Sequence, residues 1–161
     1  MKNLLAPKTE AMLNKAVAAE LFAHNFYRHL ANQMQRLGYF GAAKFFSAEA
    51  AAELEHYQLH VDYINDRGSV AKVPEVPAMK DAVSGLRDAV DQALETELQL
   101  GRDYEAWYSE CGCVTTQQHL LQFLETQRKS VGEFGDLQAR LERAGDDACG
   151  LLLIDQEMKA Q

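Results

Sequence analysis

Apolar residues recur along most of the chain at alternating steps of three and four positions, the spacing that places side chains on one face of an α-helix. The first such pattern begins after Pro7, with Thr9 as a plausible N-cap, and ends near Gly38. It predicts a helix over about residues 9–37. The stripe on one face of this helix consists of Leu13, Val17, Glu20, His24, Tyr27, Ala31 and Met34.

The same periodicity predicts three more long helices, over about residues 41–67, 82–111 and 115–143. Gly68, Gly112 and Gly145 mark the ends of these segments. The apolar run Leu151-Leu152-Leu153-Ile154 predicts a short fifth helix over about residues 148–159. The chain is therefore predicted to be helical almost throughout.

The segment from Gly68 to Asp81 has two prolines and no helical period, and a loop of this length is uncommon in a compact domain. A helix of about 27 residues is about 40 Å long, and about 14 extended residues reach about 46 Å. The loop can therefore run the length of a bundle and make the flanking helices parallel. We expect one all-α domain over residues 1–161: an antiparallel four-helix bundle with one long crossover between helices two and three, plus a short C-terminal fifth helix.

Composition narrows the class of protein. The 161 residues are 47 % hydrophobic and 25 % charged, an ordinary globular balance. The net charge of −8 argues against nucleic acid or an anionic membrane as the main partner. The N-terminal MKNLLAPKTE is too short and too polar for a signal peptide, and no apolar run is long enough to span a membrane. The three cysteines do not form the pattern of a disulfide framework, so we expect a cytoplasmic protein.

Polar residues occur at one level of the predicted bundle. Glu53 and His56 are three positions apart, so both can reach a single metal ion from one helix face. Glu20, Glu97 and Gln127 each lie within about one turn of the midpoint of another helix. Packed side by side, the four helices would bring three carboxylates, an imidazole and an amide together inside the core.

Burying these carboxylates without a compensating charge would cost several kcal/mol for each group. A divalent metal pair supplies that charge, and carboxylates with one imidazole suit iron, with manganese or zinc as competitors. Glu53 could bridge two ions, with Glu20 and His56 on one side and Glu97 on the other. The alternative is that each Glu is a boundary residue that faces water or pairs with an Arg, as in a helical bundle that serves as an interaction module.

The residues around these positions resemble the ferritins over nearly the whole chain. The resemblance rests on AELFAHNFYRHLA around Glu20, AELEHYQLHVDYINDRG around Glu53, Glu97 on the third helix and the terminal GLLLIDQEM. It is greatest for non-haem bacterial ferritins. It implies a homo-oligomeric 24-subunit cage with a di-iron ferroxidase centre in each subunit, where Fe²⁺ is oxidised by O₂ or H₂O₂ and stored as a ferric mineral.

The resemblance also implies roles for individual residues. Glu20, Glu53 and His56 would hold the first iron, and Glu53 with Glu97 the second. Tyr27 matches the tyrosine that family members place beside the site, where it could supply an electron or a hydrogen bond; the alternative is a core aromatic residue.

The chain departs from the bacterial pattern on the fourth helix and just before Glu53. Extra acidic residues that form a third iron site in many bacterial ferritins are replaced by Ala52, Thr126, Lys129 and Ser130. We therefore expect no third site. Gln127-x-x-Ser130 is similar instead to the animal heavy-chain version of this helix. The loss of a carboxylate at Ser130 predicts a weaker second side, and the alternative function is an iron-storage subunit with a weak or inactive ferroxidase centre.

Other candidate groups receive smaller roles. Glu49 and Glu133, one turn from the cluster, could supply replacement ligands. Haem is not expected, because the methionine that binds it in bacterioferritin is replaced by Leu54. Cys111 and Cys113 flank a glycine at a helix turn and are interpreted as reduced bystander thiols. His24 and His60 are interpreted as packing or surface residues.

Overall fold

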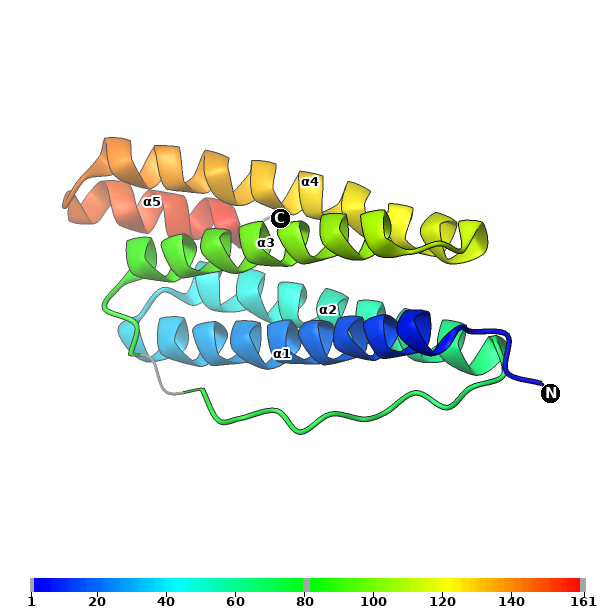
Figure 1. The fold of residues 1–161 in the computed structure, drawn as a ribbon. Coiled ribbons are helices and arrows are strands. Elements are labelled where there is room, and N and C mark those ends of the chain that lie inside the picture. Colours follow the sequence, from blue (N-terminus) through cyan, green and yellow to red (C-terminus); the bar gives the residue numbers. More distant parts are fainter. Residues whose placement is uncertain (1, 80–81, 160–161) are drawn as a thin grey trace.

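The computed structural model describes residues 2–79 and 82–159, and five helices account for most of them. Their bounds are α1 Pro7–Leu37, α2 Phe40–Asp66, α3 Leu86–Glu110, α4 Val114–Ala144 and α5 Ala148–Met158. Figure 1 shows α1 and α2 as one antiparallel pair and α3 and α4 as another, stacked into a bundle. The all-α four-helix bundle with a short fifth helix is therefore confirmed.

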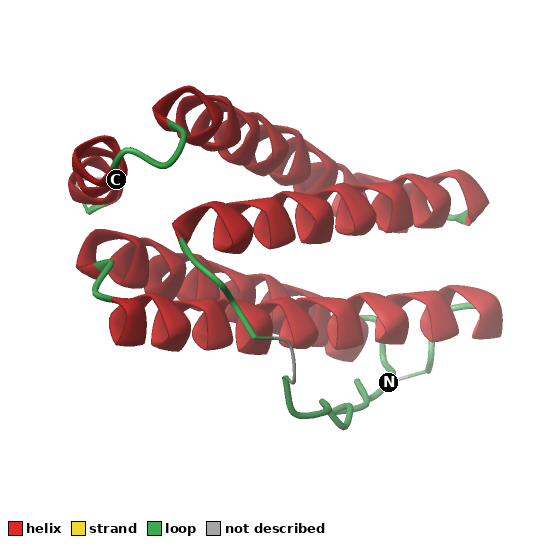
Figure 2. Ribbon diagram, turned by 90° about the vertical axis from the view of Figure 1, so that its left-hand side faces the viewer, coloured by secondary structure: helices red, strands yellow, loops and turns green. Residues whose placement is uncertain are grey.

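The crossover between α2 and α3 runs the length of the bundle along the outside of the α1–α2 pair, so α2 and α3 point the same way (Figures 1 and 2). Side-chain amides hold its start against the helices. Asn14 on α1 accepts a hydrogen bond from the Lys72 backbone N–H at 2.7 Å, and Asn65 on α2 accepts one from Ala71 at 3.3 Å. The long loop thus packs along the outside of the bundle, as its length predicted.

The predicted start of the third helix was four residues too early. Over residues 82–85 the chain is not helical, and α3 begins at Leu86. The Asp88 carboxylate accepts hydrogen bonds from the Ser84 backbone N–H (2.7 Å) and hydroxyl (3.0 Å). This side-chain bonding holds Ser84 outside the helix while satisfying its free amide. Val83 is nevertheless buried, which explains why its apolar character extended the predicted stripe.

A close approach between backbones fixes α5 against α2. A Cβ at Gly41 would lie 1.7 Å from the Asp155 carbonyl oxygen, so only glycine fits. Beside it, the Ala42 backbone N–H donates to Asp155 Oδ1 at 2.8 Å, which satisfies one of the free amides at the start of α2. The short C-terminal helix is therefore docked on the bundle end where α2 begins.

The core is divided into two apolar clusters along the bundle axis. The cluster near α5 contains stacked aromatic rings, among them Tyr27, Phe46 and Phe134. The cluster at the other end includes Leu13, Val17, Leu100, Tyr104, Leu120 and Phe123. On each of the four long helices, buried polar residues lie between the two clusters. We call this set the polar layer: Glu20, Glu53, His60, Glu97 and Gln127.

Along the described part of the chain, no helix is both long and apolar enough to cross a membrane. The crossover, the helix pairs and the divided core together place the polar layer at mid-height, enclosed by all four long helices. The layer is the candidate functional site.

Candidate metal centre

Three residues of the centre converge tightly enough to hold one cation. One ligand atom each from Glu20, Glu53 and His56 lie within 4.8 Å of one another. His56 Nδ1 lies 2.8 Å from Glu53 Oε2 and 3.8 Å from Glu20 Oε2. Both carboxylates are buried, whereas the His56 side chain is 19 % exposed. Two carboxylate oxygens and an imidazole nitrogen at this separation form the donor set expected for a transition-metal cation.

Glu20 carries the clearest sign that a cation is needed. Its Oε2 atom is buried and makes no hydrogen bond, while its Oε1 atom accepts one from the Tyr104 hydroxyl. Burial, and then the negative charge of Glu53, raise the pKa of Glu20 well above the usual range for a carboxylate. A bound cation would give Oε2 its partner and stabilise the ionised form.

The Glu97 side of the centre differs from the Glu20 side in its hydrogen bonds. The Tyr27 hydroxyl donates to Glu97 Oε1. With its amide nitrogen turned toward Glu97, Gln127 donates to Oε2 at 2.8 Å and to the Glu97 backbone carbonyl at 3.1 Å. Burial, together with the charge of Glu53, raises the pKa of Glu97 to about 8. Both oxygens of Glu97 thus already have hydrogen-bond donors, whereas Glu20 keeps one oxygen free.

The two additional carboxylates lie near the centre but outside the converging group. Burial raises the pKa of Glu49 to about 7, with smaller contributions from the charges of Glu133 and Glu53. Glu133 is exposed on α4, and partial burial raises its pKa as well. Ser130, one turn before Glu133, is partly exposed. Glu49 is therefore the better placed of the two to join a cation bound by Glu53.

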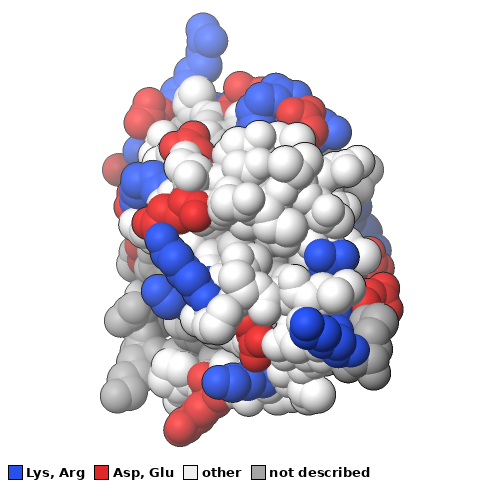
Figure 3. All heavy atoms as spheres, turned by 45° about the vertical axis from the view of Figure 1, so that its right-hand side comes forward, with Lys and Arg blue, Asp and Glu red and all other residues white. Residues whose placement is uncertain are grey.

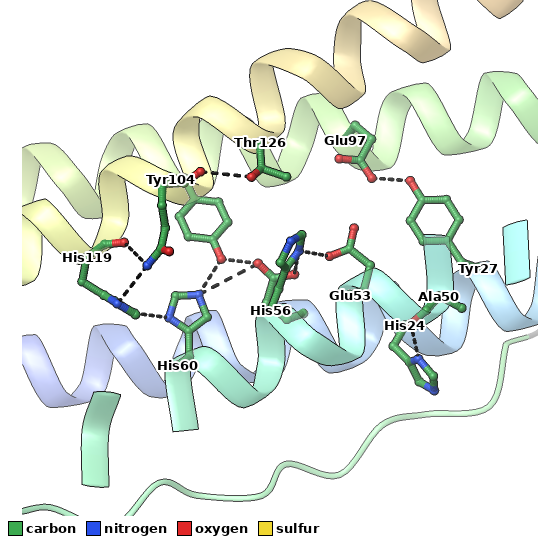
Figure 4. Close-up of polar contacts among 12 residues, drawn as sticks. His24, Tyr27, Ala50, Glu53, His56, His60, Glu97, Tyr104, His119 and Thr126 are labelled. Atoms are coloured by element: carbon green, nitrogen blue, oxygen red, sulfur yellow. Dashed lines mark hydrogen bonds and ion pairs between the residues drawn. The ribbon is translucent and has the colours of Figure 1, made fainter. Parts of the chain in front are cut away.

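Hydrogen bonds link the centre to residues that the sequence patterns did not identify. The Tyr104 hydroxyl, which donates to Glu20, also contacts His60 Nε2 at 2.7 Å. His60 Nδ1 lies 3.0 Å from His119 Nε2 on α4. Figure 4 shows these side chains as a continuous row beside His56. His60 is fully buried, so the surface alternative for this residue was wrong.

His24 is partly buried and its Nδ1 lies 2.6 Å from the Ala50 carbonyl, which is the packing role expected.

A sequence signal for Tyr104 does exist. Tyr27 follows Glu20 by seven positions on α1, and Tyr104 follows Glu97 by seven positions on α3. Because α1 and α3 are antiparallel (Figure 1), each tyrosine contacts the glutamate of the other helix, and Figure 4 shows the contact of Tyr27 with Glu97. The repeated Glu-x6-Tyr spacing was hidden because Tyr104 also fits an apolar stripe.

The thiols do not belong to this centre. Cys111 is buried and Cys113 partly buried at the turn between α3 and α4, at one end of the bundle, and both are free. Hydrogen bonds from Thr116 lower the pKa of the Cys113 thiol.

Known proteins resemble the chain over nearly its whole length. The family model of the ferritin-like domain matches residues 10–144. A bacterial non-heme ferritin of Staphylococcus aureus is 32 % identical, with 99 % of this chain and 95 % of that protein covered. A ferritin of Pacifastacus leniusculus is 31 % identical over 91 % of this chain and 85 % of its own length.

The solved structures agree in fold. An open-pore ferritin from the archaeon Archaeoglobus fulgidus superposes with a TM-score of 0.94 at 19 % identity, and 98 % of each chain is covered. The resemblance to non-haem bacterial ferritins that the motifs around Glu20 and Glu53 indicated is thus confirmed by independent comparisons. The chain belongs to the ferritin family.

Proposed function

We propose that this protein is an iron-storage protein that oxidises Fe²⁺ at a two-iron centre inside its bundle. Membership of the ferritin family supports iron storage in general. The observation that supports oxidation at this particular place is the free, buried Oε2 of Glu20, which lies with Glu53 and His56 in one group of potential ligand atoms. No other described residue set offers such a group of histidine, cysteine or carboxylate ligands.

The first Fe²⁺ would bind between Glu20, Glu53 and His56, and the second between Glu53 and Glu97, with Gln127 and Tyr27 beside it. Oxidation by O₂ then consumes two Fe²⁺ and two protons and yields two Fe³⁺ and one H₂O₂; H₂O₂ can itself serve as the oxidant. The protein supplies the spacing of the two sites and carboxylates that release the product. The Fe³⁺ would leave for storage as a ferric mineral.

A storage subunit with a weak or inactive centre is the second candidate, and the geometry of Glu97 favours it. Tyr27 and Gln127 already donate to both oxygens of this carboxylate. A second Fe²⁺ must therefore compete with two hydrogen bonds, and Ser130 offers no additional carboxylate. Glu49 could restore a ligand on this side. The two candidates differ in the affinity of the second site and hence in the oxidation rate.

The two candidates are separated by counting Fe²⁺ sites without oxygen and then admitting air. Calorimetric titration of the assembled protein should give two Fe²⁺ per chain, and the near-ultraviolet absorbance of Fe³⁺ should rise within seconds. Glu53→Gln and His56→Ala should abolish the fast rise, while Glu55→Gln, on the exposed face of α2, should leave it unchanged. Fe²⁺ binding with a weak or missing second step and without fast oxidation would favour the storage candidate, and no binding would contradict both.

We further propose assembly into a 24-subunit cage in the cytoplasm. Large apolar side chains are exposed on the isolated chain, and Figure 3 shows a broad area of uncharged residues on one face, bordered by charges of both signs. Such surfaces fit contacts between copies. With −8 on each chain, a closed shell would attract cations. Size-exclusion chromatography with light scattering tests the cage, and a monomer would contradict it. The exposed apolar residues include Leu4, Phe22, Leu37, Phe40, Leu54, Leu59, Val70 and Val73.

A further inference from the structure

Tyr104 is a buried residue of the apolar cluster whose only polar atom points into the metal centre. Its ring stacks on Phe123 with the ring centroids 5.3 Å apart and meets Trp107 edge-on at 5.1 Å. Phenylalanine would make the same ring contacts. The hydroxyl must therefore be explained by what it bonds, and its partners are Glu20 Oε1 and His60 Nε2.

The hydrogen bonds behind Tyr104 run in one direction. With a cation bound, Glu20 is an ionised carboxylate that only accepts, so the Tyr104 hydroxyl donates to Glu20 and must accept from His60 Nε2–H. His60 Nδ1 is then an acceptor, and His119 Nε2–H donates to it at 3.0 Å. At the outer end, the Gln122 amide donates to His119 Nδ1 at 3.3 Å. Every donor in this row points toward Glu20.

Both histidines are suited to a fixed neutral form. Burial lowers the pKa of His60 well below its usual range and that of His119 to about 4. Their rings are also held by stacking. The centroids of His60 and Phe123 are 4.1 Å apart, and those of His119 and Tyr63 are 4.0 Å apart. The row is thus rigid and has one hydrogen-bond polarity, which fixes the direction of the Tyr104 hydroxyl.

The consequence for the metal centre is that the two oxygens of Glu20 become unequal. Oε1 is occupied by Tyr104, whereas Oε2 is bare and lies 3.8 Å from His56 Nδ1. From this geometry we infer that Tyr104, held by His60 and His119, is a positioning residue that makes Glu20 bind its cation through Oε2 alone. This inference rests on the proposed function, because it concerns how the cation beside His56 is held.

Outer-shell partners of metal ligands are worth roughly 10–100-fold in metal affinity. Tyr104→Phe keeps the ring and removes the hydroxyl, which frees Oε1 to turn toward the cation. We expect Tyr104→Phe to weaken binding at the His56 side by roughly that factor. The coordination should change as well, because a carboxylate that binds through both oxygens adds a ligand atom.

Co²⁺ is a suitable probe because its visible spectrum reports coordination number without turnover. Titration of the wild-type assembly with Co²⁺ should give the spectrum of a site in which Glu20 binds through one oxygen. Tyr104→Phe should shift the titration midpoint upward and weaken the visible band, as expected for a higher coordination number. Co²⁺-soaked crystals should show Glu20 bound through one oxygen in the wild type and through both in the variant.

Two variants distinguish positioning from simple loss of packing. Tyr63→Phe removes a hydroxyl that bonds Thr116 and makes no hydrogen bond to Glu20, while the phenyl ring keeps its stacking on His119. It should leave the Co²⁺ midpoint and spectrum unchanged. His60→Leu removes the donor behind Tyr104 and should shift the spectrum in the same direction as Tyr104→Phe. Circular dichroism of each variant confirms that the bundle is folded.

The outcomes separate the inference from the function on which it rests. If wild-type protein binds no Co²⁺ and no Fe²⁺, the proposed function is wrong. If wild type binds Co²⁺ and Tyr104→Phe binds it with the same midpoint and spectrum, the metal centre stands and the positioning role of Tyr104 is wrong. A shift in Tyr63→Phe equal to that in Tyr104→Phe would also overturn the positioning role.

Discussion

Tyr27 and Tyr104 occupy equivalent places on antiparallel helices, and each donates its hydroxyl hydrogen bond to the glutamate that begins the other's Glu-x6-Tyr spacing. The two pairs close the polar layer on both sides of Glu53. The two glutamates differ in whether an oxygen atom is left without a hydrogen-bond donor. Glu20 keeps a bare oxygen, whereas Gln127 takes the second oxygen of Glu97. The centre is therefore unequal on its two sides.

Tyr27→Phe should affect the second cation and spare the first. The variant keeps the stacked ring contacts with Phe46 and Phe134 but removes the donor to Glu97 Oε1. Without this hydrogen bond one oxygen of Glu97 no longer has a donor with which a cation must compete, so the second site should bind Fe²⁺ more tightly, by roughly tenfold. Anaerobic Fe²⁺ calorimetry should show the first binding step unchanged and the second shifted. A shift confined to the first step would contradict this assignment of sides.

The stability of the metal-free protein should fall as the pH rises through neutrality. Burial raises the pKa of Glu20 well above its usual range and that of Glu97 to about 8. Between about pH 6 and pH 8 the protons held by these carboxylates outnumber those that neutral His60 and His119 do not take up. The folded chain therefore binds more protons than the unfolded chain, and the free energy of unfolding decreases with pH. The thermal midpoint in chelator should be lower at about pH 8.5 than at about pH 6.

A bound cation should reverse this trend, because it replaces the protons on the same carboxylates. The apparent affinity for Co²⁺ should rise over the same pH range, and the thermal midpoint of the Co²⁺-loaded protein should fall less with pH than that of the metal-free protein. Midpoints that are independent of pH in chelator would mean that the carboxylates of the layer are hydrated and ordinary.

Gly41→Ala should loosen α5 without touching the metal centre. The added methyl would lie 1.7 Å from the Asp155 carbonyl oxygen, so α5 must shift, at a cost of roughly 1–3 kcal/mol in the free energy of unfolding. Gly135→Ala is the matched control, because nothing lies within 4 Å of its added methyl and alanine favours a helix. Urea titration should show the first variant destabilised and the second unchanged or stabilised. Equal midpoints would show that α5 moves freely.

The sequence was sufficient to predict the helices and the inner polar residues for a physical reason. Glu20, Glu97 and Gln127 interrupt apolar stripes, and a charged or amide group on a core face needs a partner. Tyr104 could not be identified in the same way, because a tyrosine contributes an apolar ring to a stripe while its hydroxyl direction depends on packing. His60 lay at a stripe edge, where the sequence alone does not determine burial.

The start of α3 was misplaced for a related reason. Val83 extends the apolar stripe, but it packs against the core from an extended segment. The helix is delayed by the hydrogen bonds between Ser84 and Asp88, which periodicity does not detect. Periodicity predicts which side chains face the core, and local side-chain bonding decides where the helix begins.

Glu20→Gln should separate two effects of the buried Glu20 charge, its destabilisation of the metal-free fold and its binding of a cation. Glutamine keeps the shape of the side chain and can still accept from Tyr104, but it carries no charge to be desolvated beside Glu53. The metal-free variant should therefore be more stable than wild type at about pH 8.5, where ionised Glu20 is penalised, and closer to wild type at about pH 6. It should also lose Co²⁺ binding at the His56 side, because a neutral amide is a poor ligand for the cation. Thermal midpoints in chelator and with excess Co²⁺ measure both effects on the same samples. A variant that is less stable at both pH values would mean that the Glu20 carboxylate stabilises the fold by itself and that the polar layer needs no cation.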